Sequence, residues 1–353
     1  MGVNPKVNNL INGYSSAKHD VVWILDSNIA VNSASLSHAM QLLQQPNVGL
    51  VHHLPCGVLF SSLGSCMDAI FLNCTHARMY STINRLGVAS CVIGKSNLFR
   101  RSQLAEAGGL AYFGRFMAED NIIGMAIMNL GLEHRVAPDL AYQSLGASTL
   151  EDYFSRRVRW TRIRKYAVTA ATLYEPFSES IIAGLVAGWA FQQVLGTSIQ
   201  GFFICNTVGW YLSDLAVALS IYPFGSGIVG SPNEKDEFRI SYLVVFTWAW
   251  LMREVSALPV YIWSMIGSEV LWRGKRFYLY TDGTVEQLSP GKGRTRRDGV
   301  WLSISGPDLS PSKNSQGKSE IHKKTNKNKK RVEKHEPRVY RELRSRNIKI
   351  NIS

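Results

Sequence analysis

The sequence predicts an α/β domain followed by a membrane region and a basic tail, and three observations support this order. In the first 150 residues, short apolar runs typical of buried strands alternate with segments of helical character. Between residues 176 and 272, three apolar runs approach the ~20 residues with which a helix crosses the hydrocarbon core of a membrane. Beyond residue 290, the chain is polar and rich in lysine and arginine.

The α/β domain, residues 1–150, is predicted from the alternation of its elements along the chain. The expected strands are residues 20–26, 48–51 and 87–94. The expected helices are residues 33–45, 65–80, 99–107 and 121–130. Because strands that alternate with helices commonly run in the same direction, we expect a largely parallel sheet with helices on its faces.

Residues 151–175 are expected to form a helix that lies along a membrane surface. Cationic side chains alternate there with large apolar ones, and the cations are Arg156, Arg157, Arg159, Arg162, Arg164 and Lys165. Such a helix places its cations toward lipid phosphates and its apolar side chains toward the acyl chains.

The membrane region, residues 176–272, contains the apolar runs 181–200, 202–222 and 241–263. About three membrane helices are expected, and polar residues in the runs leave open two crossings with one re-entrant or interfacial segment. Arg253-Glu254 interrupts the third run, where isolated charges are costly. We expect the two to form an internal ion pair; a lining for a lipid headgroup site is the less favoured alternative. A juxtamembrane segment, residues 273–290, follows.

The positive charge of the chain is concentrated in its tail. Of the 39 Lys+Arg and 26 Asp+Glu that give a net charge of +13, residues 291–353 contain 18 and 6, so the body is nearly neutral. We therefore expect no specific nucleic-acid partner. The tail is expected to be disordered, and either solvated or in contact with anionic membrane lipids. Five cysteines without a CxxC pair indicate neither a disulfide framework nor a zinc knuckle.

Two acidic positions are candidates for chemistry. Asp26 ends a predicted strand, where an open α/β sheet presents ligand-binding groups, and its carboxylate is suited to hold a divalent cation against a diphosphate. A turn or a helix cap is the alternative role for Asp26. Glu119-Asp120 precedes a predicted helix and either caps it or presents a general base to a pocket.

The third candidate is the segment from Arg156 to Trp160. Arg156 and Arg159 are three residues apart, so they share one face of a helix and are suited to grip a phosphate leaving group, with Trp160 as an aromatic wall. A basic interfacial helix without a ligand is the alternative. These features follow one another along the chain: a strand-ending Asp, an Ala-Glu-Asp about 90 residues later, Arg-x-x-Arg-Trp, and apolar spans.

In this order of motifs, the chain resembles the membrane-bound inverting glycosyltransferases, and within them the ceramide glucosyltransferase family. The resemblance rests on residues 4–10, 23–27, 75–78, 107–109, 118–120 and 156–161, on Glu175-Pro176 and on Arg253-Glu254, and it extends to about residue 280. It implies a partial GT-A-like nucleotide-sugar domain. It also implies transfer of glucose from UDP-glucose to the primary hydroxyl of ceramide with inversion, giving glucosylceramide and UDP.

The resemblance also implies a role for each matched residue. Asp120 is expected to be the base that deprotonates the ceramide hydroxyl, and Asp26 is expected to hold the UDP diphosphate with a divalent cation, Mg²⁺ or Mn²⁺. Arg156, Arg159 and Trp160 are expected to stabilise the departing diphosphate and to shape the acceptor entrance. Four further positions are expected to contact or approach the substrates: Lys6, His76, Cys91 and Glu119. Ordinary packing is the alternative for His76 and Cys91.

Some features of the family have no counterpart in this sequence. An N-terminal membrane helix, a first strand and a first aspartate motif are missing, so the chain is expected to be truncated and to bind UDP-glucose poorly or to be inactive. The resemblance implies a multi-pass protein of the Golgi or ER membrane with its catalytic side facing the cytosol, in contact with membrane lipids. The rival functions are transfer to a polysaccharide or polyprenyl-phosphate acceptor, and a non-catalytic membrane partner protein.

Overall fold

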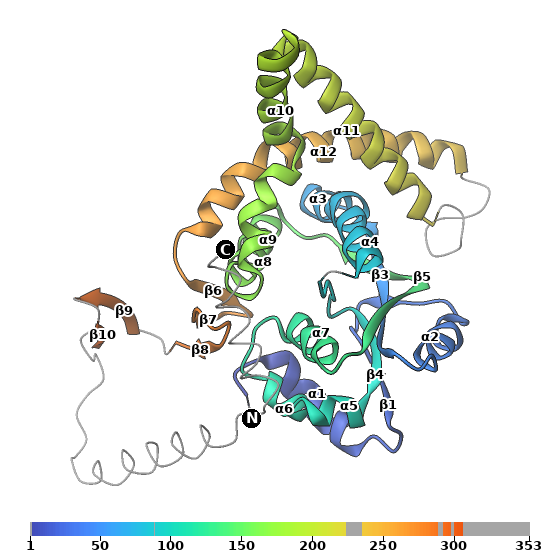
Figure 1. The fold of residues 1–353 in the computed structure, drawn as a ribbon, viewed down its shortest axis with the longest axis vertical. Helices are drawn as coiled ribbons and strands as arrows, with labels where there is room; N and C mark the ends of the chain where they lie inside the picture. The colour runs from blue at the N-terminus through green and yellow to red at the C-terminus, as the bar shows by residue number, and fades with distance from the viewer. Residues whose placement is uncertain (1, 88, 224–234, 289–291, 298–299, 306–353) are drawn as a thin grey trace.

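The computed structural model describes residues 2–87, 89–223, 235–288, 292–297 and 300–305. An α/β domain lies at one end of the molecule, and three apolar helices lie together at the other (Figure 1). These helices are α10 (Ser180–Leu195), α11 (Ile199–Ile221) and α12 (Lys235–Met265). The two parts are connected by α8 (Leu150–Ala167) and α9 (Thr169–Tyr174), which include the basic segment of the sequence.

The sheet of the α/β domain is mixed, with the strand order β1-β4-β3-β5-β2. Its strands are β1 (Val21–Leu25), β2 (Ile29–Ala30), β3 (Val48–Phe60), β4 (Ser96–Arg100) and β5 (Glu133–Gly146). Only β3 and β5 are parallel, so the expectation of a largely parallel sheet is wrong. The helical stretch after β3 returns the chain alongside the first part of that long strand, where Asn97 pairs with His52, and β4 then runs antiparallel to β3.

Of the apolar run at residues 87–94, the described residues 87 and 89–94 form a loop and not the predicted strand. Val92 is buried in the core, and the backbone groups of Gly94 bind side chains: its N–H donates to Asp120 and its carbonyl accepts from Lys6. Burial of the loop therefore produces a strand-like apolar pattern without a strand. The strand that follows, β4, also includes the first residues of the helix predicted over 99–107, which is shortened to α5 (Arg101–Glu106).

The helices of this domain pack on the sheet and on one another. One core lies among α1 (Pro5–Ser16), α5, α6 (Gly109–Phe113), α7 (Glu119–Asn129) and the strands β3 and β4. A second core lies between α2 (Ser35–Leu43) and the sheet. The helix predicted over 65–80 is an uninterrupted helical stretch of α3 (Leu63–Phe71), the π-helical η1 (Leu72–His76) and α4 (Ala77–Leu86). Predicted helices 33–45 and 121–130 correspond to α2 and α7.

In the described part of the chain, two helices are long and apolar enough to cross a membrane: α11 and residues 241–265 of α12. Only 11% of the apolar stretch of α11 and 28% of that of α12 are buried, whereas the core helix of a soluble protein is mostly buried. The third predicted span forms α10, which at 16 residues is shorter than the usual crossing length, so three spans stay a prediction. α12 continues through Pro259.

After α12, the chain returns to the α/β domain as a three-stranded antiparallel sheet. Its strands are β6 (Glu269–Trp272), β7 (Lys275–Leu279) and β8 (Val285–Gln287). Phe277 of this sheet is fully buried in a cluster with Met117, and the Val285 N–H donates to the Arg115 carbonyl at 2.9 Å. The small sheet therefore supports the loop that leads into α7.

The tail contains β9 (Lys292–Arg297) and β10 (Val300–Ser305), which pair antiparallel, where disorder is expected from the sequence. The two segments are separated in the sequence by Asp298-Gly299, a dipeptide typical of tight hairpin turns, and the second is rich in β-forming residues. Residues 306–353, with the predicted disorder and lipid contact, lie outside the described residues.

Candidate active site

Four of the predicted site residues lie together although they come from three separate segments. Lys6 of α1 places its Nζ 3.0 Å from Oδ1 of Asp26, which follows β1, and 3.6 Å from Oε1 of Glu119 in α7. Gly94 bridges Asp120 and Lys6. Its N–H donates to Asp120 Oδ2 at 2.5 Å, and its carbonyl accepts from Lys6 Nζ. We call Lys6, Asp26, Glu119 and Asp120 the carboxylate cluster.

Asn4 holds the beginning of α1 against the beginning of α7. Its Oδ1 accepts from the backbone N–H of Lys6 at 2.8 Å as the N-cap of α1, and its Nδ2 donates to Glu119 Oε2 at 2.7 Å. Asn4 is fully buried. Asn4 lies in a segment that carries the family resemblance but is not among the predicted site residues; an Asn followed by Pro at a helix start is the signal that marks it as a cap.

Glu119 and Asp120 are the first two residues of α7, so the helix begins two residues earlier than expected and the two carboxylates do not precede it. The N-cap is Ala118, and it makes no side-chain capping bond. Asp120 instead accepts from its neighbour's N–H (Asn121, 2.8 Å) and from Gly94. Carboxylates in the first helical turn are stabilised by the helix dipole, so α7 favours negative charge at this position.

Asp26 is bound by a second lysine that the sequence analysis did not identify. Lys95 Nζ lies 3.0 Å from Asp26 Oδ2, so both carboxylate oxygens face ammonium groups. In the described ranges, no group of three or more His, Cys, Asp or Glu side chains is placed to hold a metal ion. Because Mg²⁺ and Mn²⁺ need several oxygen ligands, these residues do not by themselves fit the predicted cation. The two lysines instead offer fixed positive charge, which suits a diphosphate.

The carboxylate cluster changes the titration of its members. Burial and the adjacent Asp120 raise the pKa of Glu119 to about 7, although Lys6 and Asn4 oppose this shift. For Lys6, burial lowers the pKa, but Glu119, Asp120 and Asp26 outweigh it, so the net shift is upward. The cluster therefore holds a lysine that stays charged and a buried carboxyl that exchanges its proton near neutral pH.

His76 packs among aromatic side chains of α3 and α4, and Cys91 lies in the loop that precedes β4. The His76 ring lies 5.4 Å from that of Tyr80 and 5.7 Å from that of Phe71, and burial together with nearby Arg157 lowers its pKa to about 3. Burial raises the pKa of the Cys91 thiol to about 11, and Cys91 interacts electrostatically with both Arg164 of α8 and Asp120. Both side chains are therefore neutral at physiological pH.

The arginines of α8 lie in different environments. Arg156 forms an ion pair with Asp68 of α3, a residue that the sequence analysis missed. Arg159 makes no hydrogen bond or ion pair with any residue that the structure describes, and burial lowers its pKa to about 10. Arg157, also missed, is buried, and its guanidinium carbon lies 3.7 Å from the centroid of the Phe71 ring. Spacing alone does not distinguish these three arginines.

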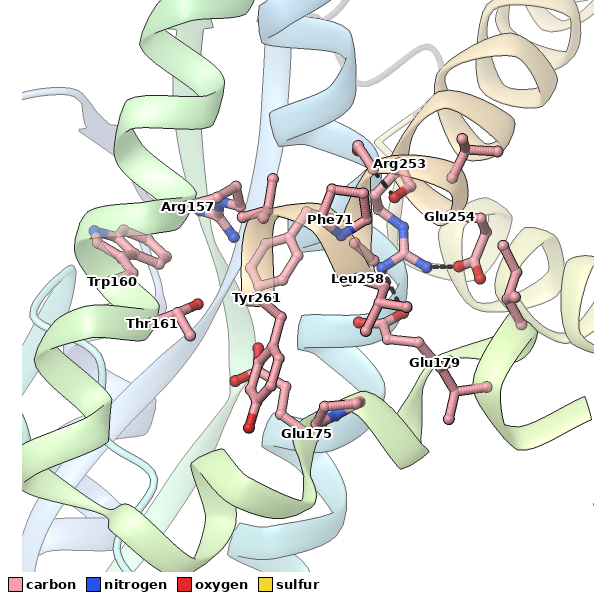
Figure 2. A pocket seen from close by; sticks show the side chains of 18 of the residues that line it. Phe71, Arg157, Trp160, Thr161, Glu175, Glu179, Arg253, Glu254, Leu258 and Tyr261 are labelled. Atoms are coloured by element: carbon pink, nitrogen blue, oxygen red, sulfur yellow. Dashed lines mark hydrogen bonds and ion pairs between the residues drawn. The ribbon is translucent and has the colours of Figure 1, made fainter. Parts of the chain in front are cut away.

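A cavity of about 320 Å³ lies beside α8 and opens among the apolar helices (Figure 2). Arg157, Trp160 and Thr161 of α8 line one side, and Phe71 of α3 lies next to them. The other walls come from η2 (Glu175–Ser178), the start of α10 and α12, and their apolar residues are Pro176, Ile181, Ile182, Val255, Leu258, Pro259, Val260 and Tyr261. The cavity therefore connects the predicted Arg-x-x-Arg-Trp motif to the membrane helices.

The charges in the cavity wall are balanced. Three arginines and three glutamates line it: Arg157, Arg164, Arg253, Glu175, Glu179 and Glu254. Figure 2 shows Arg253 between two carboxylates; it binds Glu254 and lies 3.1 Å from Glu179. Arg253 and Glu254 thus form the expected internal ion pair, and both also line the cavity.

Comparison with known proteins identifies the family of this chain. The model of glycosyl transferase family 21 matches residues 1–285. A ceramide glucosyltransferase of Komagataella phaffii is 32% identical over 81% of this chain and 70% of its own length. Those of Gibberella zeae and Candida albicans are 30% and 28% identical, over 84% and 81% of this chain and 72% and 73% of theirs. The resemblance drawn from the sequence motifs is confirmed. With a family match that covers most of the sequence, and relatives of this similarity, the chain belongs to glycosyl transferase family 21.

Proposed function

We propose that this site transfers glucose from UDP-glucose to the primary hydroxyl of ceramide, with inversion, giving β-glucosylceramide and UDP. The observation that carries the proposal is that the chain combines the polar carboxylate cluster with a cavity that Trp160 lines and that opens among the apolar helices. Glycosylation of a lipid requires both a polar centre for the nucleotide sugar and an apolar entrance for the acceptor.

The nucleotide diphosphate would bind where positive charge is already fixed. Lys6 and Lys95 hold their ammonium groups 3.0 Å from Asp26, and Arg159 is a further cation without an ion-pair partner among the described residues. Cations in place before the reaction stabilise the negative charge that develops on the leaving UDP. The mechanism has no step through the predicted divalent cation, because both Asp26 oxygens face lysines.

The acceptor hydroxyl would be deprotonated by Asp120. Its two oxygens each accept one backbone N–H, from Gly94 and Asn121, and each retains a lone pair for a hydroxyl proton. These bonds fix the carboxylate in position, which favours direct attack on the anomeric carbon from one side.

The balanced charges of the cavity favour ceramide over the rival acceptors. A polyprenyl phosphate would bring an anion to a wall with three glutamates for its three arginines, whereas ceramide has a neutral amide and hydroxyl headgroup. Basic residues of α8 and residues 273–276 flank the membrane helices on the side of the α/β domain. This asymmetry is typical of the cytosolic side, so we propose a Golgi or ER membrane protein whose site faces the cytosol.

The test is an assay of the purified protein in lipid vesicles with UDP-[¹⁴C]glucose and ceramide. We expect labelled glucosylceramide, and we expect Asp120→Asn to lower kcat by about 100-fold or more because the base is removed. Asp20→Asn, the same change at an exposed carboxylate, serves as the control. Label in a polymer or a polyprenyl product would contradict the proposal, as would unchanged turnover in Asp120→Asn.

Two additions make the assay more informative. Excess EDTA measures whether a divalent cation is required for turnover. Titration calorimetry with UDP-glucose measures the weak binding expected from the sequence. If the protein binds UDP-glucose and still gives no labelled lipid, the proposed transfer is wrong; if it does not bind UDP-glucose, the prediction of weak binding is confirmed.

A further inference from the structure

Near its start, the helix α12 packs on the α/β domain. Tyr242, Phe246 and Trp250 are buried in one hydrophobic core with Met67 and Ile70 of α3. Their spacing of four residues places the three side chains on one face of α12. This face therefore belongs to the interface with α3, although the helix is long and apolar enough to cross a membrane.

The end of α12 is bound by α8, the helix that directly follows the α/β domain. Arg162 donates to the Trp263 carbonyl at 3.0 Å, and Lys165 donates to the Met265 carbonyl at 3.0 Å. Such side chains satisfy the last carbonyls of a helix, which have no partner within it. From Tyr242 to Met265, α12 extends about 35 Å, and it is held at both ends. In Figure 1, α12 accordingly runs along the α/β domain, whereas α10 points away from it.

The opposite face of α12 is apolar and exposed. Its residues recur every three or four positions, which is the spacing of one helical face: Val244, Trp248, Leu251, Val255, Leu258 and Ile262. Arg253 and Glu254 interrupt the apolar run in the sequence, but both are buried on the other side of the helix, where Arg253 lies 3.1 Å from Glu179. α12 thus has an apolar face and a face with charges, as a helix at a membrane surface does.

The hairpin before α12 returns the chain to the α/β domain. The start of α10 lies beside the middle of α11, where Asn206 Nδ2 donates to the Ser180 carbonyl at 3.0 Å. Farther along α11, Asp214 lies 3.0 Å from Arg78 of α4, and Tyr222, directly after α11, is buried in the core that includes α3. The hairpin therefore ends on the side of the membrane on which the α/β domain lies.

The chain is on the same side after α12. The carbonyl of Glu269 in β6 accepts from Arg162 at 2.6 Å, and the N–H of Val285 in β8 donates to the Arg115 carbonyl at 2.9 Å. A complete crossing by α12 would separate β6, β7 and β8 from the domain that they bind by the thickness of the membrane. Because both ends of α12 lie on the side of this domain, a complete crossing does not fit the structure.

We infer that α12 does not cross the membrane but lies along its surface, with the α/β domain on one face and lipid on the other. The occupant of the exposed face is lipid, because α10 and α11, the hairpin that precedes it, are also apolar and largely exposed. Helices of this kind bury their apolar face about 5–10 Å into the boundary between headgroups and acyl chains. In this position, Arg253 and Glu254 face protein and avoid the cost of charges at the centre of a bilayer. The inference concerns membrane attachment and does not depend on the proposed function.

The sidedness of α12 is the first test. Sealed microsomes that contain the full-length protein are treated with a membrane-impermeant maleimide, and mass spectrometry measures the modification of one introduced cysteine at a time. Ser241→Cys lies before the apolar stretch of α12, Lys275→Cys lies after it, and Glu106→Cys marks the side of the α/β domain; all three positions are exposed. We expect the three cysteines to be labelled together or protected together, and detergent to change all three alike.

The depth of α12 is the second test, and it uses the wild-type protein in phosphatidylcholine vesicles. Photoreactive lipids carry a diazirine either in the headgroup or at the end of an acyl chain, and mass spectrometry maps the labelled residues. We expect Val244, Val255 and Ile262 to show the same ratio of headgroup to chain-end labelling, because a helix in the interface lies at one depth. In a crossing helix, Val255 would lie about 10 Å deeper than the other two, and its ratio would be the lowest.

Three results would overturn the inference. One is labelling of Ser241→Cys from the side opposite to Lys275→Cys, and another is a lowest ratio at Val255. The third is the absence of lipid labelling at Val244, Val255 and Ile262, which would show that a second copy or another protein covers this face. A poorly folded cysteine variant cannot imitate the depth result, because that measurement uses the wild type. Neither test bears on ceramide glucosylation, which the vesicle assay examines separately.

Discussion

Replacing Glu119 with glutamine should remove a large pH dependence from the stability of the α/β domain. The pKa of this carboxyl is raised from 4.5 to about 7 by burial and by Asp120. The folded protein therefore keeps the proton up to pH 7, whereas the unfolded chain releases it above pH 4.5. Protonated Glu119 thus favours the folded state at low pH, and this contribution is lost as pH rises from 4.5 through 7.

The magnitude follows from the two pKa values. Between pH 5 and pH 8, the unfolded state gains about 2.5 kcal/mol relative to the folded state from this one group. The glutamine of the variant has no such transition, yet its amide oxygen can still accept the hydrogen bond from Asn4 that Glu119 Oε2 accepts. For a domain of ~150 residues, the difference corresponds to about 5–10 °C in melting temperature.

The assay is thermal unfolding of detergent-solubilised wild type and Glu119→Gln at pH 5 and pH 8. We subtract the change in melting temperature between pH 5 and pH 8 in the variant from that in wild type. This difference cancels the contribution of every titrating group that the two proteins share. We expect the wild type to lose about 5–10 °C more than the variant on going to pH 8. Glu106→Gln, an exposed carboxylate of the same domain, should show no difference from wild type. Equal pH effects in wild type and Glu119→Gln would refute the account of the carboxylate cluster.

Two further predictions test contacts around the site. Gly94→Ala would place a Cβ 2.5 Å from Lys6 Nζ and 2.9 Å from Asp120 Oδ2, so these side chains must move out of their positions in the carboxylate cluster; we expect kcat/KM to fall at least about tenfold with unchanged circular dichroism, and normal activity would contradict the role of this cluster. Asp68→Asn should lower the free energy of unfolding by about 3–5 kcal/mol, because it leaves buried Arg157 without its anionic neighbour at 3.7 Å. Denaturant titration checks this, with a loss below about 1 kcal/mol as the contrary result.

Candidate site residues at the ends of strands and helices can be predicted from the sequence, because the ends of these elements follow from local patterns. Asp26 after an apolar run and Glu119-Asp120 at a helix start are identified in this way, and the structure places them in one cluster with Lys6. Sheet direction is not local. β4 is antiparallel to β3 because of the path that the chain takes between the two strands. The apolar periodicity of the sequence carries no information about that path.

The residues that sequence reasoning missed are those whose role depends on a distant partner. Nothing in the sequence distinguishes Lys95 from the other lysines, and only the fold shows that its Nζ lies 3.0 Å from Asp26 Oδ2. Asp68 lies in the largely apolar helix α3, and its ion pairs with Arg156 and Arg157 of α8 explain a carboxylate at that position. Arg157 differs from its neighbours by facing Phe71, a contact between α8 and α3.

The small sheet after α12 has a consequence for the order of biosynthesis. The loop before α7 is completed by the hydrogen bond from Val285 to Arg115, a residue 170 positions earlier in the chain. Residue 285 is synthesised only after all of the apolar helices. The segment carrying Glu119 and Asp120 therefore reaches its final form as a late event, after the apolar helices have been synthesised.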